Sequence, residues 1–184
     1  MGDMVIGVDP SLRRTGLAAV EPRGDAAPRI LELRVLRGEL PRRAGLARRT
    51  ARLSELRGGL RAFLDAWPPS LAAVEGYAFH PTASRGHAIA EWGGVLRLEL
   101  ADRGIPFFLV PPPSLRLYAS GVGGGRRAPK DLVGHANSLL GAEIPGREDD
   151  LADALFLAAI AAGWDDGAAH RAGSAAALRE RGAL

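Results

Sequence analysis

The chain has 184 residues and a formal net charge of +3, with 47% hydrophobic residues, 5% aromatic residues and no cysteine. This length suits one well-buried domain, and the absence of cysteine fits a cytoplasmic protein. No apolar run approaches the length that crosses a bilayer, and the N-terminus lacks the basic and apolar regions of a signal peptide, so we expect no membrane association.

The positive charge comes almost entirely from arginine, because Lys130 is the only lysine, and the isoelectric point is about 10.1. Basic proteins of this kind often bind polyanions. A composition biased toward Ala, Gly, Arg and Pro would give the same balance without any nucleic-acid partner. Composition alone therefore leaves a polyanion-binding function open.

The first predicted element is a buried strand at residues 4–8, which ends on Asp9 and enters a Pro10-Ser11 turn. An apolar run restarts at Thr15-Gly16, so the two runs form a hairpin-like pair. A carboxylate at the end of a central strand is costly to bury unless it meets a cation. Asp9 is therefore a candidate metal ligand, although an Asp that caps its own turn would give the same local pattern.

The other elements follow from apolar periodicity and from turn residues. The strand at 30–36, which follows the hairpin, is expected on the edge of the sheet. Ser114 is expected to be the N-cap of the short helix at 114–119. Small residues at Gly93-Gly94 indicate close packing against another helix, either within the chain or across a dimer. The arginines of the helix at 45–67, with Arg52 among them, are expected to form a solvated face rather than a nucleic-acid stripe. Strands are expected at 30–36, 71–75 and 107–110, and helices at 45–67, 83–103, 114–119, 129–140 and 150–162.

The C-terminal residues from Asp165 show no persuasive apolar face. We expect a frayed helix or disorder there. The predicted domain organisation is one folded domain at residues 1–164, followed by a flexible or frayed tail at 165–184.

Three further acids repeat the Asp9 pattern or extend it. The strand at 71–75 ends on Glu75, and Asp150 and Asp153 share one face near the start of the last helix. Asp153 lies in an apolar stretch where an unpaired charge is costly, whereas Glu148 and Asp149 suit the helix dipole. Two strand-end acids and a late helical pair predict carboxylates that converge on hard cations such as Mg²⁺ or Mn²⁺.

These three acidic motifs, at 8–16, at Val74-Glu75 and at 150–155, resemble those of the RuvC family of Holliday junction resolvases, in the RNase H-like superfamily. The similarity runs from about Met4 to Ala162. It implies an α/β, RNase H-like fold: a mixed five-stranded sheet, with three antiparallel and then two parallel strands, and helices on both faces.

The resemblance also implies a homodimeric, magnesium-dependent endonuclease that nicks a four-way DNA junction symmetrically and leaves 5′-phosphate and 3′-hydroxyl ends. Each active site would hold two Mg²⁺ ions, for which Mn²⁺ substitutes. The metal ligands would be Asp9, Glu75, Asp150 and Asp153. Branch-migration machinery would be a further partner.

Basic residues flank a glycine-containing loop in the family, and Arg116 and Lys130 stand at the matching positions here. Either side chain would contact DNA phosphates, and Arg126 and Arg127 of the loop would add to the contact. Lys130 is also a candidate catalytic residue, since a solitary lysine in an arginine-rich chain indicates a need for a compact ammonium group. Ordinary surface charge remains an alternative for Arg116.

The chain departs from the family pattern after Glu75. An aromatic residue that stacks on DNA is expected three positions later, but Ala78 stands there, flanked by Tyr77 and Phe79. These two rings would either stack on DNA or pack in the core. Gly76 replaces the usual glutamine, which makes this stretch more similar to phage-type and other divergent RuvC-like nucleases.

Three alternative functions therefore remain at this stage. One is a branched-DNA-binding module without catalysis, and another is an RNase H-like nuclease that acts on other branched DNA or on RNA. The third is a sugar kinase or actin-like ATPase, which opens with a similar strand, although Pro10-Ser11 replaces the glycine turn of that class.

Overall fold

A five-stranded mixed sheet is the centre of the computed structural model, which describes residues 3–39, 41, 44–76, 83–121, 132–165 and 174–182. The strand order is β3-β2-β1-β4-β5, in which β1, β2 and β3 pair antiparallel while β4 and β5 run parallel to β1. The predicted sheet is thereby confirmed, with β3 on its edge. The strands are β1 (Val5–Asp9), β2 (Arg14–Arg23), β3 (Ala26–Arg37), β4 (Leu71–Glu75) and β5 (Phe107–Val110).

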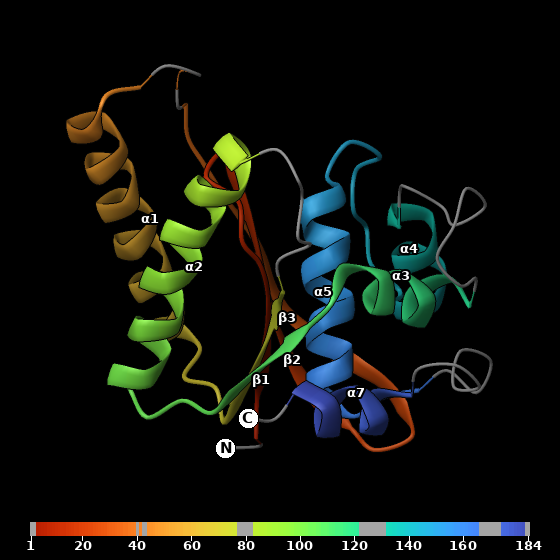
Figure 1. Cartoon of the computed structure of the whole chain (residues 1–184). Helices are drawn as coiled ribbons and strands as arrows, with labels where there is room; N and C mark the ends of the chain where they lie inside the picture. The colour runs from red at the N-terminus through yellow and green to blue at the C-terminus, as the bar shows by residue number, and fades with distance from the viewer. Residues whose placement is uncertain are drawn as a thin grey trace.

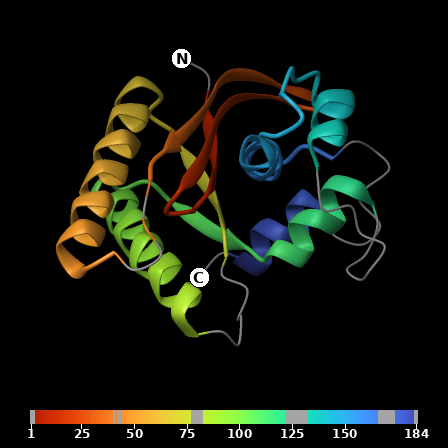
Figure 2. The ribbon, with the colours of Figure 1, turned by 90° about the horizontal axis from the view of Figure 1, so that it is seen from above.

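Helices cover both faces of the sheet, as predicted (Figure 1). One face carries α1 (Leu46–Ala66) and α2 (Ala83–Asp102). The other carries α3 (Pro112–Ser120), α4 (Val133–Leu140), α5 (Asp149–Ala162) and α7 (Ala175–Gly182). Figure 2 looks down the axis of α5, which lies between the sheet and the outer helices of its face. None of the helices in the described ranges combines the length and apolar character needed to cross a bilayer.

The alternation of side chains along each strand divides the interior into two cores. Val5 of β1 belongs to the core under α5, whereas Ile6 and Val8 belong to the core under α1 and α2. By the same alternation, Asp9 faces α5. Strand β1, most of β2 and the middle of β4 are buried on both sides, which explains why they read as short apolar runs.

Two glycines bring the backbone of α5 directly against the sheet. A Cβ atom on Gly7 would lie 2.0 Å from the carbonyl oxygen of Ala154, and one on Gly16 would lie 2.0 Å from the carbonyl oxygen of Asp150. No side chain fits in either place, so glycine is required for this close approach. The start of α5 is consequently fixed over the ends of β1 and β2.

The structure corrects the predicted starts of two helices. Helix α3 begins at Pro112, and Pro111 rather than Ser114 stands at its N-cap position, without a side-chain cap. Proline suits a first helical turn because its missing N–H has no helical partner there. Helix α4 begins at Val133, while residues 122–131 lie outside the described part of the chain.

Two further expectations are changed by the structure. A Cβ atom on Gly94 would meet nothing within 4 Å among the described residues, so Gly94 does not pack closely against a helix of its own chain, and packing across a dimer stays a prediction. The C-terminal segment contains helix α7, whose Ala175 and Leu178 are buried in the core under α5. These two residues form the apolar face of α7, which the sequence did not reveal. The domain boundary at residue 164 stays a prediction.

Candidate metal centre

Asp9 and Glu75 lie side by side at the ends of two parallel strands. Val8 is in register with Val74, so the next residue of each strand reaches the same edge of the sheet on the same face. Asp9 is only 8% exposed, and its carboxyl group is hydrogen-bonded to that of Glu75. The two strand-end acids predicted from the sequence therefore meet.

Helix α5 brings the other two predicted ligands to this edge. Gly16 pairs with Asp9 in the β1–β2 ladder, and the backbone of Asp150 rests against Gly16. The charge of Asp150 acts on Asp9, and the charge of Asp9 acts on Asp153. All four acids thus surround one end of the sheet, uppermost in Figure 1, where α5 begins.

Burial and mutual repulsion hold three of these acids toward their protonated forms. Burial, followed by the charge of Glu75, raises the pKa of Asp9 well above its ordinary value. Burial raises the pKa of Glu75 as well, although its hydrogen bond with Asp9 opposes the shift. Burial and the charge of Asp9 raise the pKa of Asp153 to about 7, against the opposing charge of Arg116. The cluster has an excess of negative charge that a bound cation would neutralise.

Asp150 differs because, among the described residues, it alone of the four forms an ion pair. The Nε atom of Arg14 donates to Oδ2 of Asp150, and a terminal nitrogen of Arg14 lies 2.6 Å from Glu148. Arg37 of β3 also contacts Glu148, at 2.6 Å. A hydrogen bond from Arg37, aided by Arg14, lowers the pKa of Glu148. Glu148 is therefore an ion-pair partner in addition to a helix-start acid, and sequence reasoning identified neither arginine.

The turn after Asp9 is held by α1. Arg52 is 4% exposed, and its Nε atom donates to the carbonyl oxygen of Leu12 at 2.9 Å. Its terminal nitrogens reach the carbonyl oxygen of Leu36 and the carboxylate of Glu55. The prediction that Arg52 belongs to a solvated face is wrong.

Helix α2 holds the same turn through one buried hydroxyl group. Thr15 donates from Oγ1 to the carbonyl oxygen of Ser11 at 2.6 Å, and the indole N–H of Trp92 donates to that Oγ1 at 3.1 Å. Both helices of the far face thus fix the backbone that presents Asp9. Neither the Arg52–Leu12 contact nor the Trp92–Thr15 contact could be predicted from a local pattern, because each joins residues far apart in the chain.

The predicted DNA-contacting residues fall into two groups. Arg116 lies on α3 with an exposed side chain, and its charge acts on Glu75 and Asp153. The structure therefore brings Arg116 near the acids. The others lie outside the described residues: Tyr77, Phe79, Arg126, Arg127 and Lys130.

A family model described as crossover junction endodeoxyribonuclease RuvC matches residues 5–161. The chain belongs to the RuvC family. A RuvC from Synechococcus sp. (strain WH7803) is 34% identical, over 87% of this chain and 97% of its own length. One from Moorella thermoacetica is 30% identical, over 84% of this chain and 88% of its own. The predicted family resemblance is confirmed.

Solved structures show the same fold. A Thermus thermophilus RuvC in complex with a Holliday junction substrate superimposes with a TM-score of 0.70 and 22% identity, covering 85% of this chain and 90% of that one. The yeast mitochondrial Holliday junction resolvase Ydc2 gives a TM-score of 0.54 and 16% identity, covering 84% of this chain and 75% of that one. The RNase H-like architecture of the RuvC family is therefore present here.

The chemistry of the acids fits the divalent cation on which RuvC nucleases depend. Four carboxylates offer the hard oxygen ligands that Mg²⁺ and Mn²⁺ prefer, and the burial of Asp9 and partial burial of Glu75 and Asp153 favour a neutralising ion. Within the described ranges, however, no three acidic or histidine side chains are already grouped so that they could hold one ion. The donor types fit, while the side chain of Asp150 faces Arg14.

Proposed function

We propose that this RuvC-family chain is a structure-selective DNA endonuclease that resolves four-way junctions by metal-dependent hydrolysis. Its paired, symmetrical nicks leave 5′-phosphate and 3′-hydroxyl ends. The observation that supports this best is the crowding of buried Asp9 with half-buried Glu75 and Asp153. The pKa of each of these acids is raised, and none of them forms an ion pair among the described residues.

The proposed metal ligands are Asp9, Glu75, Asp150 and Asp153, for two Mg²⁺ ions that Mn²⁺ replaces. When bound, such ions activate the attacking water and stabilise the leaving 3′ oxygen. The chain contributes position: the two strand ends are fixed by the sheet ladder, and α5 is fixed by its contact with Gly7 and Gly16. A rigid arrangement of this kind lowers the cost of aligning the phosphate with the water.

DNA would approach the acids past α3. Arg116 is an exposed cation close enough to influence Glu75 and Asp153, so it suits a phosphate beside the scissile bond. We assign Lys130, Arg126 and Arg127 to the same phosphate contact, with Lys130 also at the reacting phosphate. Tyr77 or Phe79 would stack on bases. The T. thermophilus RuvC that shares the fold is described with a Holliday junction substrate.

Paired nicks require two active sites, so we propose a homodimer. We also propose a cytoplasmic location and cooperation with branch-migration machinery. The apolar stripe of α2 is used within the chain, since Trp92, Leu96 and Leu100 are buried in its own core. Measurement of the mass in solution tests the dimer: a fully active monomer would contradict the paired-nick mechanism.

The decisive experiment compares a labelled synthetic four-way junction with a linear duplex of the same sequence, with Mg²⁺ and with chelator. We expect symmetrical nicks on the junction alone, and only with metal. Asp9→Asn should abolish cleavage while junction binding stays measurable. Full activity of this variant would exclude the assigned site, and binding without cleavage by the native chain would favour a non-catalytic module.

A salt titration tests the DNA contacts. Arg116→Ala and Lys130→Ala should each weaken binding and reduce the slope of log affinity against log salt by about 1. Arg29→Ala serves as the matched control, because Arg29 pairs with Glu21 on the β2–β3 hairpin, away from the acids. Equal slopes for Arg116→Ala and the native chain would rule out the phosphate contact.

A further inference from the structure

Arg14 is the first residue of β2 and faces the same side of the sheet as Gly16, toward the start of α5. Its Nε atom donates to Oδ2 of Asp150, and a terminal nitrogen lies 2.6 Å from Oε2 of Glu148 and 3.4 Å from the carbonyl oxygen of Arg147. One guanidinium group therefore joins a strand of the sheet to the loop and first turn that carry two of the acids.

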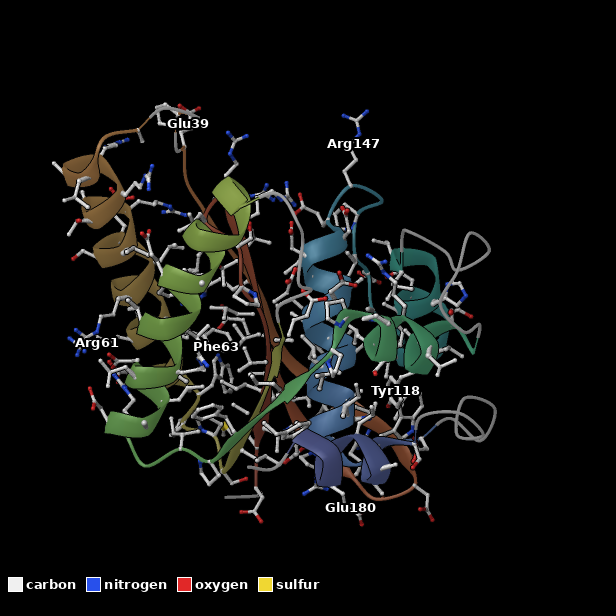
Figure 3. The ribbon with its side chains drawn as sticks, in the orientation of Figure 1. Glu39, Arg61, Phe63, Tyr118, Arg147 and Glu180 are labelled. Atoms are coloured by element: carbon white, nitrogen blue, oxygen red, sulfur yellow. The ribbon has the colours of Figure 1, made fainter. Side chains whose placement is uncertain are left out.

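Arg37, the arginine beside Arg14, contacts Glu148 but not Asp150. Arg37 is in register with Arg14 across β2 and β3, and its terminal nitrogen lies 2.6 Å from Oε1 of Glu148. The two arginines thus divide the oxygens of Glu148 between them, and Arg14 alone of the two donates to Asp150. Figure 3 shows Arg147 projecting from this end of the molecule, beside the same loop.

Arg14 carries a permanent charge in this position. The hydrogen bond to Asp150 raises the pKa of Arg14, against the opposing effect of burial, so the guanidinium stays charged at any working pH. The contact is partly shielded, since the Arg14 side chain is 34% exposed and that of Asp150 is 21% exposed. Electrostatic effects at such a site are stronger than between fully hydrated charges.

This contact makes the four candidate ligands unequal. An ion that uses Oδ2 of Asp150 must displace the Nε of Arg14. An ion that uses only Oδ1 must bind beside a fixed positive charge. In both cases Arg14 opposes the binding of a cation at Asp150, whereas Asp9, Glu75 and Asp153 carry no comparable ion pair within the described residues.

We infer that Arg14 is a built-in counter-cation of the metal centre, which holds Asp150 in the metal-free chain and weakens the ion that depends on Asp150. Metal loading is then stepwise: a first ion draws together the carboxylates of Asp9, Glu75 and Asp153, which are not yet grouped around one point, and a second ion competes with Arg14. This inference rests on the proposed metal-dependent function. It assigns Arg14 as a positioning residue that acts through Asp150.

A calorimetric titration of the metal-free protein with Mn²⁺, at low ionic strength, tests the inference without any cleavage assay. The native chain should show a tighter and a weaker class of site. Arg14→Gln should tighten the weaker class by about five- to tenfold, the size expected when one charge is removed a few ångströms away. Arg37→Gln should leave both classes within about twofold, because Arg37 contacts Glu148 and not Asp150.

Thermal unfolding separates this role from a purely structural tie. In chelator, Arg14→Gln should unfold at a lower temperature than the native chain, and saturating Mn²⁺ should close most of that gap. A structural tie would leave the same gap with and without Mn²⁺, and would overturn the inference. If Arg14→Gln does not fold, Arg14→Lys replaces it, because lysine keeps the charge but cannot bridge Asp150 and Glu148 as the guanidinium does. Arg14→Lys should tighten Mn²⁺ binding at the weaker class of site by a smaller factor, and unchanged binding would contradict the inference.

Asp9→Asn distinguishes failure of the inference from failure of the proposed site. If Asp9→Asn loses the tighter class while Arg14→Gln binds Mn²⁺ like the native chain, the metal centre stands and the role of Arg14 is wrong. If Asp9→Asn binds Mn²⁺ like the native chain, the proposed metal centre is itself wrong. Equal tightening by Arg14→Gln and Arg37→Gln would indicate a general charge effect and would also overturn the inference.

Discussion

Two buried carboxylates in this molecule meet opposite surroundings. Glu99 of α2 is 2% exposed and accepts hydrogen bonds from three arginines: Arg57 at 2.7 Å, Arg61 at 2.8 Å and Arg103 at 2.9 Å. Burial alone would raise the pKa of Glu99, but these hydrogen bonds lower that pKa to about 2. Asp9 is almost as buried, yet its neighbours are acids and its pKa is raised.

The contrast separates an acid that the protein itself neutralises from the acids that we propose as metal ligands. A buried charge is tolerated when the protein supplies its partners, as between α1 and α2. At the end of the sheet the partner must come from outside, except where Arg14 supplies it to Asp150. Burial of a carboxylate therefore indicates its role only when the charges around that carboxylate are also known.

The largest effect on stability should come from Glu99→Gln. Loss of this charge leaves three arginines without their shared partner, and we expect the free energy of unfolding to fall by about 3 kcal/mol. Urea denaturation at pH 7 measures the change. Glu55→Gln is the control, since Glu55 is exposed and its one ion pair with a described residue is with Arg52, in the i,i+3 position; it should cost less than about 1 kcal/mol.

Acidification should remove the difference in unfolding free energy between the native chain and Glu99→Gln. Because the pKa of Glu99 is lowered in the fold, its contribution is complete above its ordinary value of 4.5 and is lost as pH falls toward about 2. The gap in unfolding free energy between the native chain and Glu99→Gln should narrow steadily below pH 4.5. A gap that widens on acidification would contradict the ion cluster.

Gly16→Ala should have the next largest effect, at the acid-rich end of the sheet. The new Cβ would lie 2.0 Å from the carbonyl oxygen of Asp150, so α5 must shift, at a cost of about 1–3 kcal/mol and with weaker metal binding. Gly94→Ala is the matched control, because a Cβ there meets open space within a helix; it should be neutral or stabilising. Similar losses in both variants would refute the close contact.

The smallest effect should be a gain in stability from Asp9→Asn. In chelator at pH 8 the charged form of Asp9 is disfavoured by burial and by Glu75, so the neutral amide should raise the free energy of unfolding by about 1 kcal/mol. Asp25→Asn, on an exposed turn, should change it by less than about 0.5 kcal/mol. A clear loss of stability in Asp9→Asn would remove the contrast with Glu99.

The sequence predicted the hairpin-like first pair of strands, the edge strand that follows and the meeting of Asp9 with Glu75, because both acids end short apolar runs. The family resemblance implied the mixed sheet, and the structure supplies the strand order. The sequence also predicted the shared face of Asp150 and Asp153 from their spacing. Gly7 and Gly16 carried a usable signal that was not used, since glycine inside a strand often marks a close backbone approach.

Other features left no local pattern to find. Arg14, Arg37 and Arg52 are three arginines among many in this chain, and what distinguishes them is the partner that each meets across the fold. The start of α3 could have been predicted from its prolines. Helix α7 depends on two buried residues, Ala175 and Leu178, which are too few to stand out in an Ala-, Gly- and Arg-rich segment.

The position of α5 has a consequence for the newly made chain. Asp9 and Arg14 lie near the N-terminus, whereas Asp150 comes 136 positions after Arg14. Translation delivers the N-terminal residues first, and contacts between such distant residues form late in folding. A growing chain on the ribosome therefore carries its strand-end acids long before Asp150 and Asp153 are made, and the proposed metal centre is complete only when residues 149–162 have emerged and packed against the sheet.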